Sequence, residues 1–318
     1  MESKKRINLK NWGIVILLIV MMIVFSVMSP NFLNLMNIRN ILLQNAHVAV
    51  VSIAVAIIMI SGGTDLSIGY EMALASVISA IMMEDGCSVV LAILVAIIVT
   101  IVCSIFNEAM ALLLKGHTMI ITLGTMSAYQ GLAYIISNSK NFHNMPDPFL
   151  AIGQGKIAGI LPINVVIMLV IFVIAILVMD RTHAGKKLYA VGDNPEAARL
   201  AGINVSKVKI TAFALAGVLV GIASVMLTAR TGNATATTGS GLEFTGITAA
   251  VLGGVSLKGG EGKIWQVVIA TYVLGILSNG MQLIGLGTYP QYIAKCIVML
   301  LAIGIGNNAF DKLFKRSR

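Results

Sequence analysis

One acidic residue, Asp65, lies among small and hydroxyl-bearing residues in the segment 61–69, between two strongly apolar stretches. Three glycines interrupt the apolar pattern there, and irregular backbone inside a membrane is tolerated only where it is buried in protein or lines water. Because a carboxylate can accept the free N–H groups of a first helical turn, we expect Asp65 to cap a helix beginning at Leu66. Two alternatives are contact with a polar solute and coupling to a proton or another ion.

A scattered set of polar side chains interrupts the other apolar runs. Its members are Gln44, Asn45, Glu71, Asn107, Glu108, Thr122, Gln130, Asn279, Gln282 and Lys295. A charged group facing lipid at mid-depth costs about 2–3 kcal/mol, so these side chains are expected to face other helices or a cavity. Any single one could form an ordinary interhelical hydrogen bond. As a set they indicate a polar interior.

The longest predicted loop, residues 181–209, contains the signals of a short helix. Asn194 is a favourable N-cap, Pro195 suits the first helical position, and Glu196 complements the helix dipole. Gly202 is placed to end the helix as a C-cap. A helix of about two turns is unstable alone in water, so we expect it to dock against something. An ordinary surface turn is the alternative.

A second glycine-rich region, residues 231–263, surrounds a short apolar run at 242–257. Paired glycine-interrupted stretches, here and at 61–69, are typical of discontinuous helices around a central pathway. The turn that ends at Lys263 is not a phosphate-binding P-loop, because Ile264 follows that lysine. If ATP is used, another chain must hydrolyse it.

No arrangement of residues in the sequence suggests catalysis. The four histidines are dispersed, and the three cysteines form no CxxC pair, so neither a catalytic triad nor a zinc site or disulfide framework is predicted. We therefore expect a chain that is not an enzyme and that binds no metal or cofactor itself.

The elements that must position these residues are apolar helices. The chain has 318 residues, 58% hydrophobic and 11% charged, with a mean hydropathy of +0.93. Soluble proteins carry about 25% charged residues, so an ordinary cytosolic enzyme is excluded. We predict an all-α, polytopic membrane protein with about ten transmembrane helices, each of about 20 residues. The apolar runs lie at 12–28, 43–60, 66–83, 88–113, 117–137, 163–179, 208–229, 242–257, 264–284 and 290–307.

Basic residues orient these spans. Most of the 22 lysines and arginines fall on one predicted side, while Lys295 lies within a span and only Arg39, Lys140, Lys156 and Arg230 fall on the other side. This bias predicts that both termini are cytoplasmic. It also accounts for the net charge of +9 without nucleic acid, whose binding would need stacking or groove-lining residues. The expected organisation is a tail at 1–11, a membrane region at 12–307 and a basic tail at 308–318.

In the glycine-interrupted segments and the long loop described above, the chain resembles the membrane permease subunits of bacterial ATP-binding-cassette importers for simple sugars, the ribose/galactose type. The segment around Asp65 is similar to that family's Gly-Ile-Asp-Leu-Ser-Val-Gly block. The loop at 189–203 resembles its coupling loop. The likeness extends over about residues 12–307. The other similar segments are 122–126, 249–260, 279–280 and 291–295.

The resemblance implies a machine in the bacterial cytoplasmic (inner) membrane. Two permeases, as a homodimer or a heterodimer, would form the channel, cytoplasmic ATPases would use ATP and Mg, and a binding protein would deliver the solute. The helix that enters the ATPase would comprise Asn194, Pro195, Glu196, Ala197, Ala198, Arg199, Leu200 and Gly202. The residues predicted to lie near the solute pathway are Asp65, Ser67, Asn45, Asn107, Thr122, Asn279 and Gln282.

Three positions depart from the family's pattern. Thr245 stands where an Asp is usual, Thr118 where a Pro is common, and Glu108 where a Gly is usual. These departures put ribose itself in doubt as the solute. The predicted function is inward passage of a small hydrophilic solute, such as a pentose or hexose, powered by ATP on partner subunits. An ion- or proton-coupled secondary transporter that uses carboxylates within its spans is the alternative.

Overall fold

The computed structural model describes residues 9–306, which are almost entirely helical. The helices are α1 Leu9–Met28, α2 Leu35–Ile60, α3 Ile68–Glu84, α4 Val89–Leu114, α5 Thr118–Ser137, α6 Asp147–Gln154, α7 Ile163–Arg181, α8 His183–Asp193, α9 Pro195–Leu200, α10 Val205–Thr231, α11 Leu242–Leu252, α12 Ile264–Leu283 and α13 Thr288–Gly306. Two short strands, β1 Lys156–Ile157 and β2 Leu161–Pro162, pair antiparallel. The expectation of an all-α fold is confirmed.

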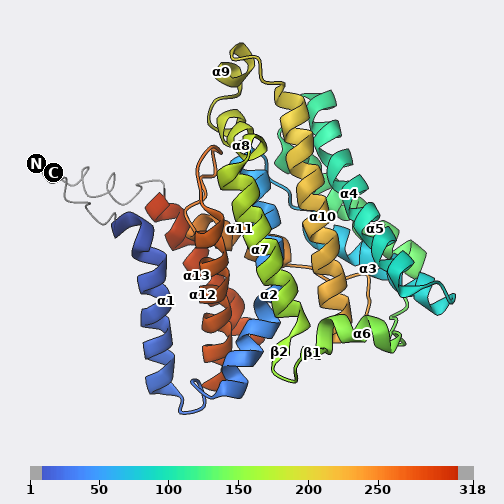
Figure 1. Cartoon of the computed structure of the whole chain (residues 1–318), viewed down its shortest axis with the longest axis vertical. Coiled ribbons are helices and arrows are strands. Elements are labelled where there is room, and N and C mark those ends of the chain that lie inside the picture. Colours follow the sequence, from blue (N-terminus) through green and yellow to red (C-terminus); the bar gives the residue numbers. More distant parts are fainter. Residues whose placement is uncertain (1–8, 307–318) are drawn as a thin grey trace, which may run out of the picture.

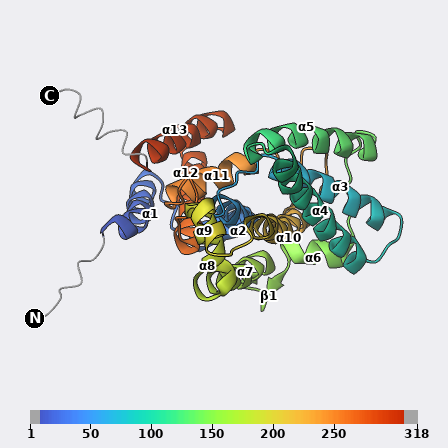
Figure 2. The ribbon, with the colours of Figure 1, turned by 90° about the horizontal axis from the view of Figure 1, so that it is seen from above.

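The helices run between two distinct ends of the molecule. Helices α8 and α9 gather at one end, called the α9 end, while α6 and the β1–β2 hairpin lie at the other, called the α6 end (Figure 1). Helix α1 packs against α12 at one edge, and α3, α4 and α5 lie together on the opposite side of the molecule (Figure 2). Helix α10 contacts both α2 and α4 and so joins the two sides.

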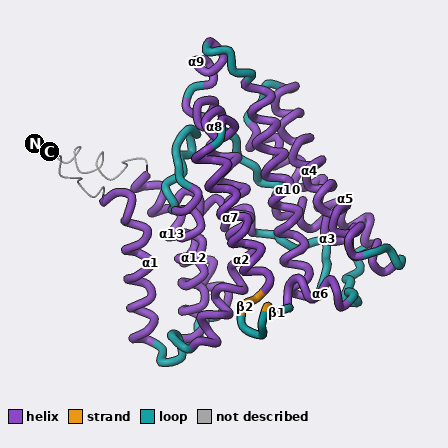
Figure 3. The backbone as a smooth tube through the Cα atoms, viewed as in Figure 1, coloured by secondary structure: helices purple, strands orange, loops and turns teal. Residues whose placement is uncertain are grey.

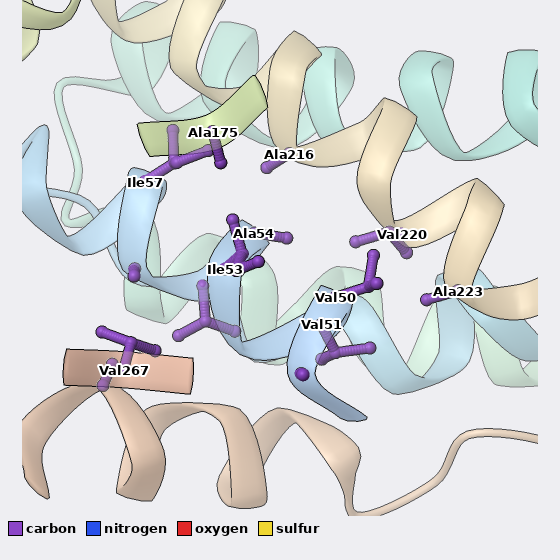
Figure 4. Packing of buried hydrophobic residues seen from close by; sticks show 14 of the residues in the cluster. Val50, Val51, Ile53, Ala54, Ile57, Ala175, Ala216, Val220, Ala223 and Val267 are labelled. Carbon is purple, nitrogen blue, oxygen red and sulfur yellow. The ribbon is translucent and has the colours of Figure 1, made fainter. Parts of the chain in front are cut away.

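Helix α2 forms the centre of the core. Every residue from Ala46 to Ile60 is buried, as expected for a helix that is apolar around its whole circumference. Its side chains meet α7 at Ala175, α10 at Ala216 and Val220, and α12 at Val267 (Figure 4). The segment 61–69 leaves α2 directly from this core, so its position is fixed by the surrounding helices.

Small residues let α10 and α4 approach closely. A Cβ atom on Gly217 would lie 2.7 Å from the Cα atom of Ile101, and one on Gly221 would lie 2.6 Å from the Cα atom of Ile97. Thr100 Oγ1 donates to the carbonyl oxygen of Gly217 at 2.8 Å. Small residues and interhelical hydrogen bonds of this kind are typical of helix packing in membranes.

Within residues 9–306, six helices are long and apolar enough to cross a membrane: α2, α4, α5, α7, α10 and α12. The predicted end of the span at 242–257 is wrong, because the helix α11 ends at Leu252 and not near residue 257. Gly254 adopts φ +81°, and the N–H of Val255 closes the helix on the carbonyl of Ala250 at 2.9 Å. Eleven residues of α-helix extend about 16 Å, roughly half of a bilayer core.

Candidate functional site

The turn between α2 and α3 holds Asp65 in a defined position. Asp65 Oδ1 accepts hydrogen bonds from the backbone N–H of Ser67 at 2.8 Å and from Ser67 Oγ at 2.7 Å. The predicted helix start at Leu66 is wrong: α3 begins at Ile68, with Ser67 at the N-cap position. The reason is that the first carbonyl to accept hydrogen bonds from the helix is that of Ser67, from the N–H groups of Tyr70 and Glu71 at 2.9 Å each. The N–H of Leu66 donates to Thr122 Oγ1 of α5, at 3.1 Å.

A buried polar cluster forms where this turn meets α3 and α4. Asn107 Nδ2 lies 3.2 Å from Asp65 Oδ2, 2.8 Å from Ser67 Oγ and 2.9 Å from Glu71 Oε1. Ser67 Oγ lies 3.0 Å from Glu71 Oε1. Asn107 of α4 therefore links both carboxyl groups to the start of α3.

Two further side chains complete the cluster. Tyr129 of α5 donates from Oη to Asn107 Oδ1 at 2.9 Å, which orients the amide nitrogen toward the carboxyl groups. Ser104 Oγ donates to Glu71 Oε2 at 2.8 Å. We call Asp65, Ser67, Glu71, Ser104, Asn107 and Tyr129 the Asp65 network, all six of which are buried. Sequence reasoning noted Glu71 only as a polar residue within a span and missed Ser104 and Tyr129, since nothing in their local pattern distinguishes them.

The Asp65 network is satisfied by neutral donors. Among residues 12–301, no lysine, arginine or histidine pairs with either carboxyl group. The hydroxyl and amide donors around Asp65 and Glu71 take up their oxygens, as buried polar groups require. Chemically, the arrangement can brace the turn against three helices, and it leaves few of its polar atoms free for a solute.

The other predicted pathway residues lie apart from this network. Asn279 of α12 and Asn37 of α2 exchange two amide hydrogen bonds of 2.9 Å each. Asn45 donates to the carbonyl of Ile41 at 2.7 Å within α2 and faces α12, and Gln282 is exposed. The structure thus brings together Asp65, Ser67, Asn107 and Thr122, but not Asn45, Asn279 or Gln282.

A third carboxyl group, Glu243 at the start of α11, also packs against the beginning of α3. Both of its oxygens accept the N–H of Gly241 at 3.1 Å. A Cβ atom on Gly69 would collide with the Glu243 carboxylate, so only glycine at that position allows this close approach. The glycine-rich stretch before α11 is therefore attached to the same helix that carries Glu71.

The predicted short helix in the long loop is confirmed as α9, with its caps. Asn194 Oδ1 accepts the N–H of Ala197 at 3.0 Å. Gly202 adopts φ +81°, and the N–H of Ile203 bonds to the carbonyl of Ala198 at 3.0 Å, which closes the helix. The preceding helix α8 was not predicted, although Thr182 caps it by accepting the N–H of Gly185 at 3.2 Å.

Helix α9 protrudes from the α9 end of the molecule (Figure 3). Of its six residues only Ala198 is buried, and Leu200 at its tip is 88% exposed. Glu196 and Arg199 form an exposed ion pair with 2.6 Å between Oε2 and Nη2. A capped helix that is too short to be stable alone, with an exposed leucine, has the form of a docking element.

The family model described as "Branched-chain amino acid transport system / permease component" matches residues 37–305. The chain belongs to this family. As a permease component it is a transport subunit, which confirms the expectation that it is not an enzyme.

Several proteins resemble this permease along most of its length. The ribose import permease protein RbsC of Escherichia coli (strain K12) is 35% identical over 298 residues, 92% of this chain and 92% of that protein. RbsC of Bacillus subtilis (strain 168) is 34% identical over 288 residues, 90% and 89% of the two chains. The L-arabinose transport system permease protein AraH of Escherichia coli (strain K12) is 32% identical over 292 residues, which cover 92% of this chain and 89% of that protein. No solved structure matches the chain.

Thr245, Glu108 and Thr118, which the sequence resemblance predicts to differ from the family's pattern, occupy distinct places. Thr245 of α11 and Lys295 of α13 line one cavity of about 320 Å³, which α12 also borders. Glu108 of α4 is buried, and its Oε2 has no hydrogen-bond partner within the described part of the chain. Thr118 is buried at the first residue of α5. None of the three belongs to the Asp65 network.

Proposed function

We propose that this permease moves a simple sugar, a pentose or hexose, inward across a bacterial cytoplasmic membrane. Separate ATPase subunits supply the energy by hydrolysing ATP with Mg. The similarity to permeases named for ribose and L-arabinose supports the solute class. The observation that carries the proposal is α9, a capped and exposed helix with the features expected of a coupling helix.

In this proposal the α9 end faces the cytoplasm and both termini lie on that side. The helices that cross or enter the membrane are α1 to α5, α7 and α10 to α13. Six of them meet the length and hydropathy expected of a span, and α11 enters only partway. The α6 end faces the extracytoplasmic solute-binding protein, and a second permease copy, identical or related, completes the channel.

The pathway residues take different roles in this proposal. The donors around Asp65 and Glu71 are already used within the Asp65 network. The network therefore holds the wall of the pathway in place, with Thr122 bracing the same turn. The permease itself binds the solute only weakly, so the solute-binding protein determines which solute is transported.

The proposal is tested at the tip of α9. Leu200→Asp replaces the exposed leucine that we propose contacts the ATPase with a charged residue. The ATPase should then no longer co-purify with the permease. ATP-dependent uptake in proteoliposomes should fall about tenfold or more. The matched control is Ile160→Asp. Ile160 is also apolar and exposed but lies at the α6 end, so this variant should still bind the ATPase. Retained ATPase and normal uptake in Leu200→Asp would contradict the proposal. Uptake without any ATPase that an uncoupler abolishes would support an ion-coupled carrier instead.

A further inference from the structure

Glycines from three segments meet near the α9 end of the molecule. Gly62 follows α2, Gly192 lies in α8, and Gly259 and Gly260 lie in the loop after α11; we call these four residues the glycine junction. A Cβ atom on Gly259 would lie 2.8 Å from both the carbonyl oxygen of Gly192 and the Cα atom of Gly62. A Cβ atom on Gly192 would collide with the carbonyl oxygen of Ile60 and lie 2.6 Å from the nitrogen of Gly260. The three segments therefore touch backbone to backbone.

Hydrogen bonds hold the loop after α11 in the junction. The N–H of Gly260 donates to the carbonyl of Ile60 at 2.9 Å, and Tyr189 Oη of α8 donates to the carbonyl of Gly262 at 2.9 Å. Burial and nearby Asp180 raise the pKa of Tyr189 to about 12, so its hydroxyl remains a donor at neutral pH. A cavity of about 450 Å³, lined in part by Tyr189, Gly260 and Gly262, leaves space beside the loop.

Short pieces of chain connect the junction to both regions of the candidate site. Asn194, the N-cap of α9, follows Gly192 after a single residue, Asp193. On the other side, Asp65 follows Gly62 after Gly63 and Thr64. Only a few residues of chain therefore separate α9 from the junction, and the junction from the Asp65 network.

We infer that the glycine junction transmits movement of α9 to the turn 61–67 and thereby to the Asp65 network. Its four glycines are positioning residues for transport, an inference that rests on the proposed coupling role of α9. Backbone atoms in close contact cannot move independently, because close-packed groups have no room to compress. Gly62, Gly259 and Gly260 adopt positive φ angles of +83°, +94° and +73°, and a Cβ atom on Gly192 would collide with Ile60, so these positions favour glycine. Without side chains between them, the segments have no flexible groups that would absorb the movement.

A substitution within the junction tests this inference. In proteoliposomes that contain the partner ATPase, Gly192→Ala should bind the ATPase normally, but solute taken up per ATP hydrolysed should fall about tenfold. The control is Gly131→Ala, also a helical glycine, around which a Cβ atom would meet nothing within 4 Å; its ratio should not change. An unchanged ratio in Gly192→Ala would overturn the inference.

A measurement on the unmodified complex covers the case in which Gly192→Ala does not fold. Hydrogen exchange is compared between the nucleotide-free complex and the complex trapped with a non-hydrolysable ATP analogue. Exchange in 61–67 should change together with exchange in 190–194, whereas the turn at 85–88 should not respond. A response in 190–194 without one in 61–67 overturns the inference but leaves the proposed function standing. No response in either segment, together with normal uptake by Leu200→Asp, overturns both.

Discussion

The Asp65 network and α9 use polar residues in opposite ways. In the network, side chains from the turn 61–67 and three helices satisfy one another in a buried space. In α9, Asn194 caps the first turn, Glu196 and Arg199 pair with each other at the surface, and most of the helix, including Leu200, is exposed. The first region is complete within one chain, whereas the second is complete only with a partner. Disruption of the network should therefore affect stability, and disruption of α9 should affect coupling.

The largest effect is expected from Asn107→Leu. Loss of the amide removes the donor shared by Asp65, Ser67 and Glu71, and buried acceptors without donors should lower the free energy of unfolding by about 3 kcal/mol. Thermal unfolding in detergent measures this, with the exposed Asn40→Leu as the control. A melting temperature equal to that of the control would show that the network does not stabilise the fold.

A smaller and more local effect is expected from Asn194→Ala. It removes the side chain that accepts the N–H of Ala197, which should destabilise α9 by about 1 kcal/mol. ATP-dependent uptake should fall several-fold, while the melting temperature should remain that of the unmodified permease. A lowered melting temperature with normal uptake would reverse the contrast between the two regions.

The smallest effect is expected from Glu196→Gln. This change removes an ion pair whose side chains are 70% and 72% exposed, and pairs of that kind contribute between about 0 and 1 kcal/mol. Neither the melting temperature nor uptake should change measurably. A strong loss of uptake would show that Glu196 contacts the ATPase directly, which would sharpen the assignment of the docking surface.

Local signals predicted much of the architecture. The apolar runs correspond to helices, and the caps of α9 at Asn194 and Gly202 were read correctly because capping depends on residues close in sequence. The end of α11 was missed, since the apolar run continues past Leu252 and only the glycine pair at 253–254 ends the helix.

The site was predicted less completely, because its members come from distant helices. Asp65 and Asn107 were predicted from their polarity in apolar surroundings, but nothing local indicates that Tyr129 orients Asn107. Glu243 was missed as a neighbour of α3 for the same reason: its contact with Gly69 joins residues far apart in sequence. The start of α3 shifted from Leu66 to Ile68 because the first carbonyl that accepts helical hydrogen bonds is that of Ser67, which the residues around Asp65 do not reveal.

The contact between Gly69 and Glu243 also bears on how this chain can vary. A Cβ atom at position 69 would occupy the space that the Glu243 carboxylate fills, and it would also lie 2.7 Å from the carbonyl oxygen of Gly239. A shorter residue at 243 would therefore remove only one of the two obstacles, because the backbone of Gly239 would still block a side chain at 69. In any library of variants of this permease, position 69 should therefore accept only glycine, whereas position 243 should accept shorter residues.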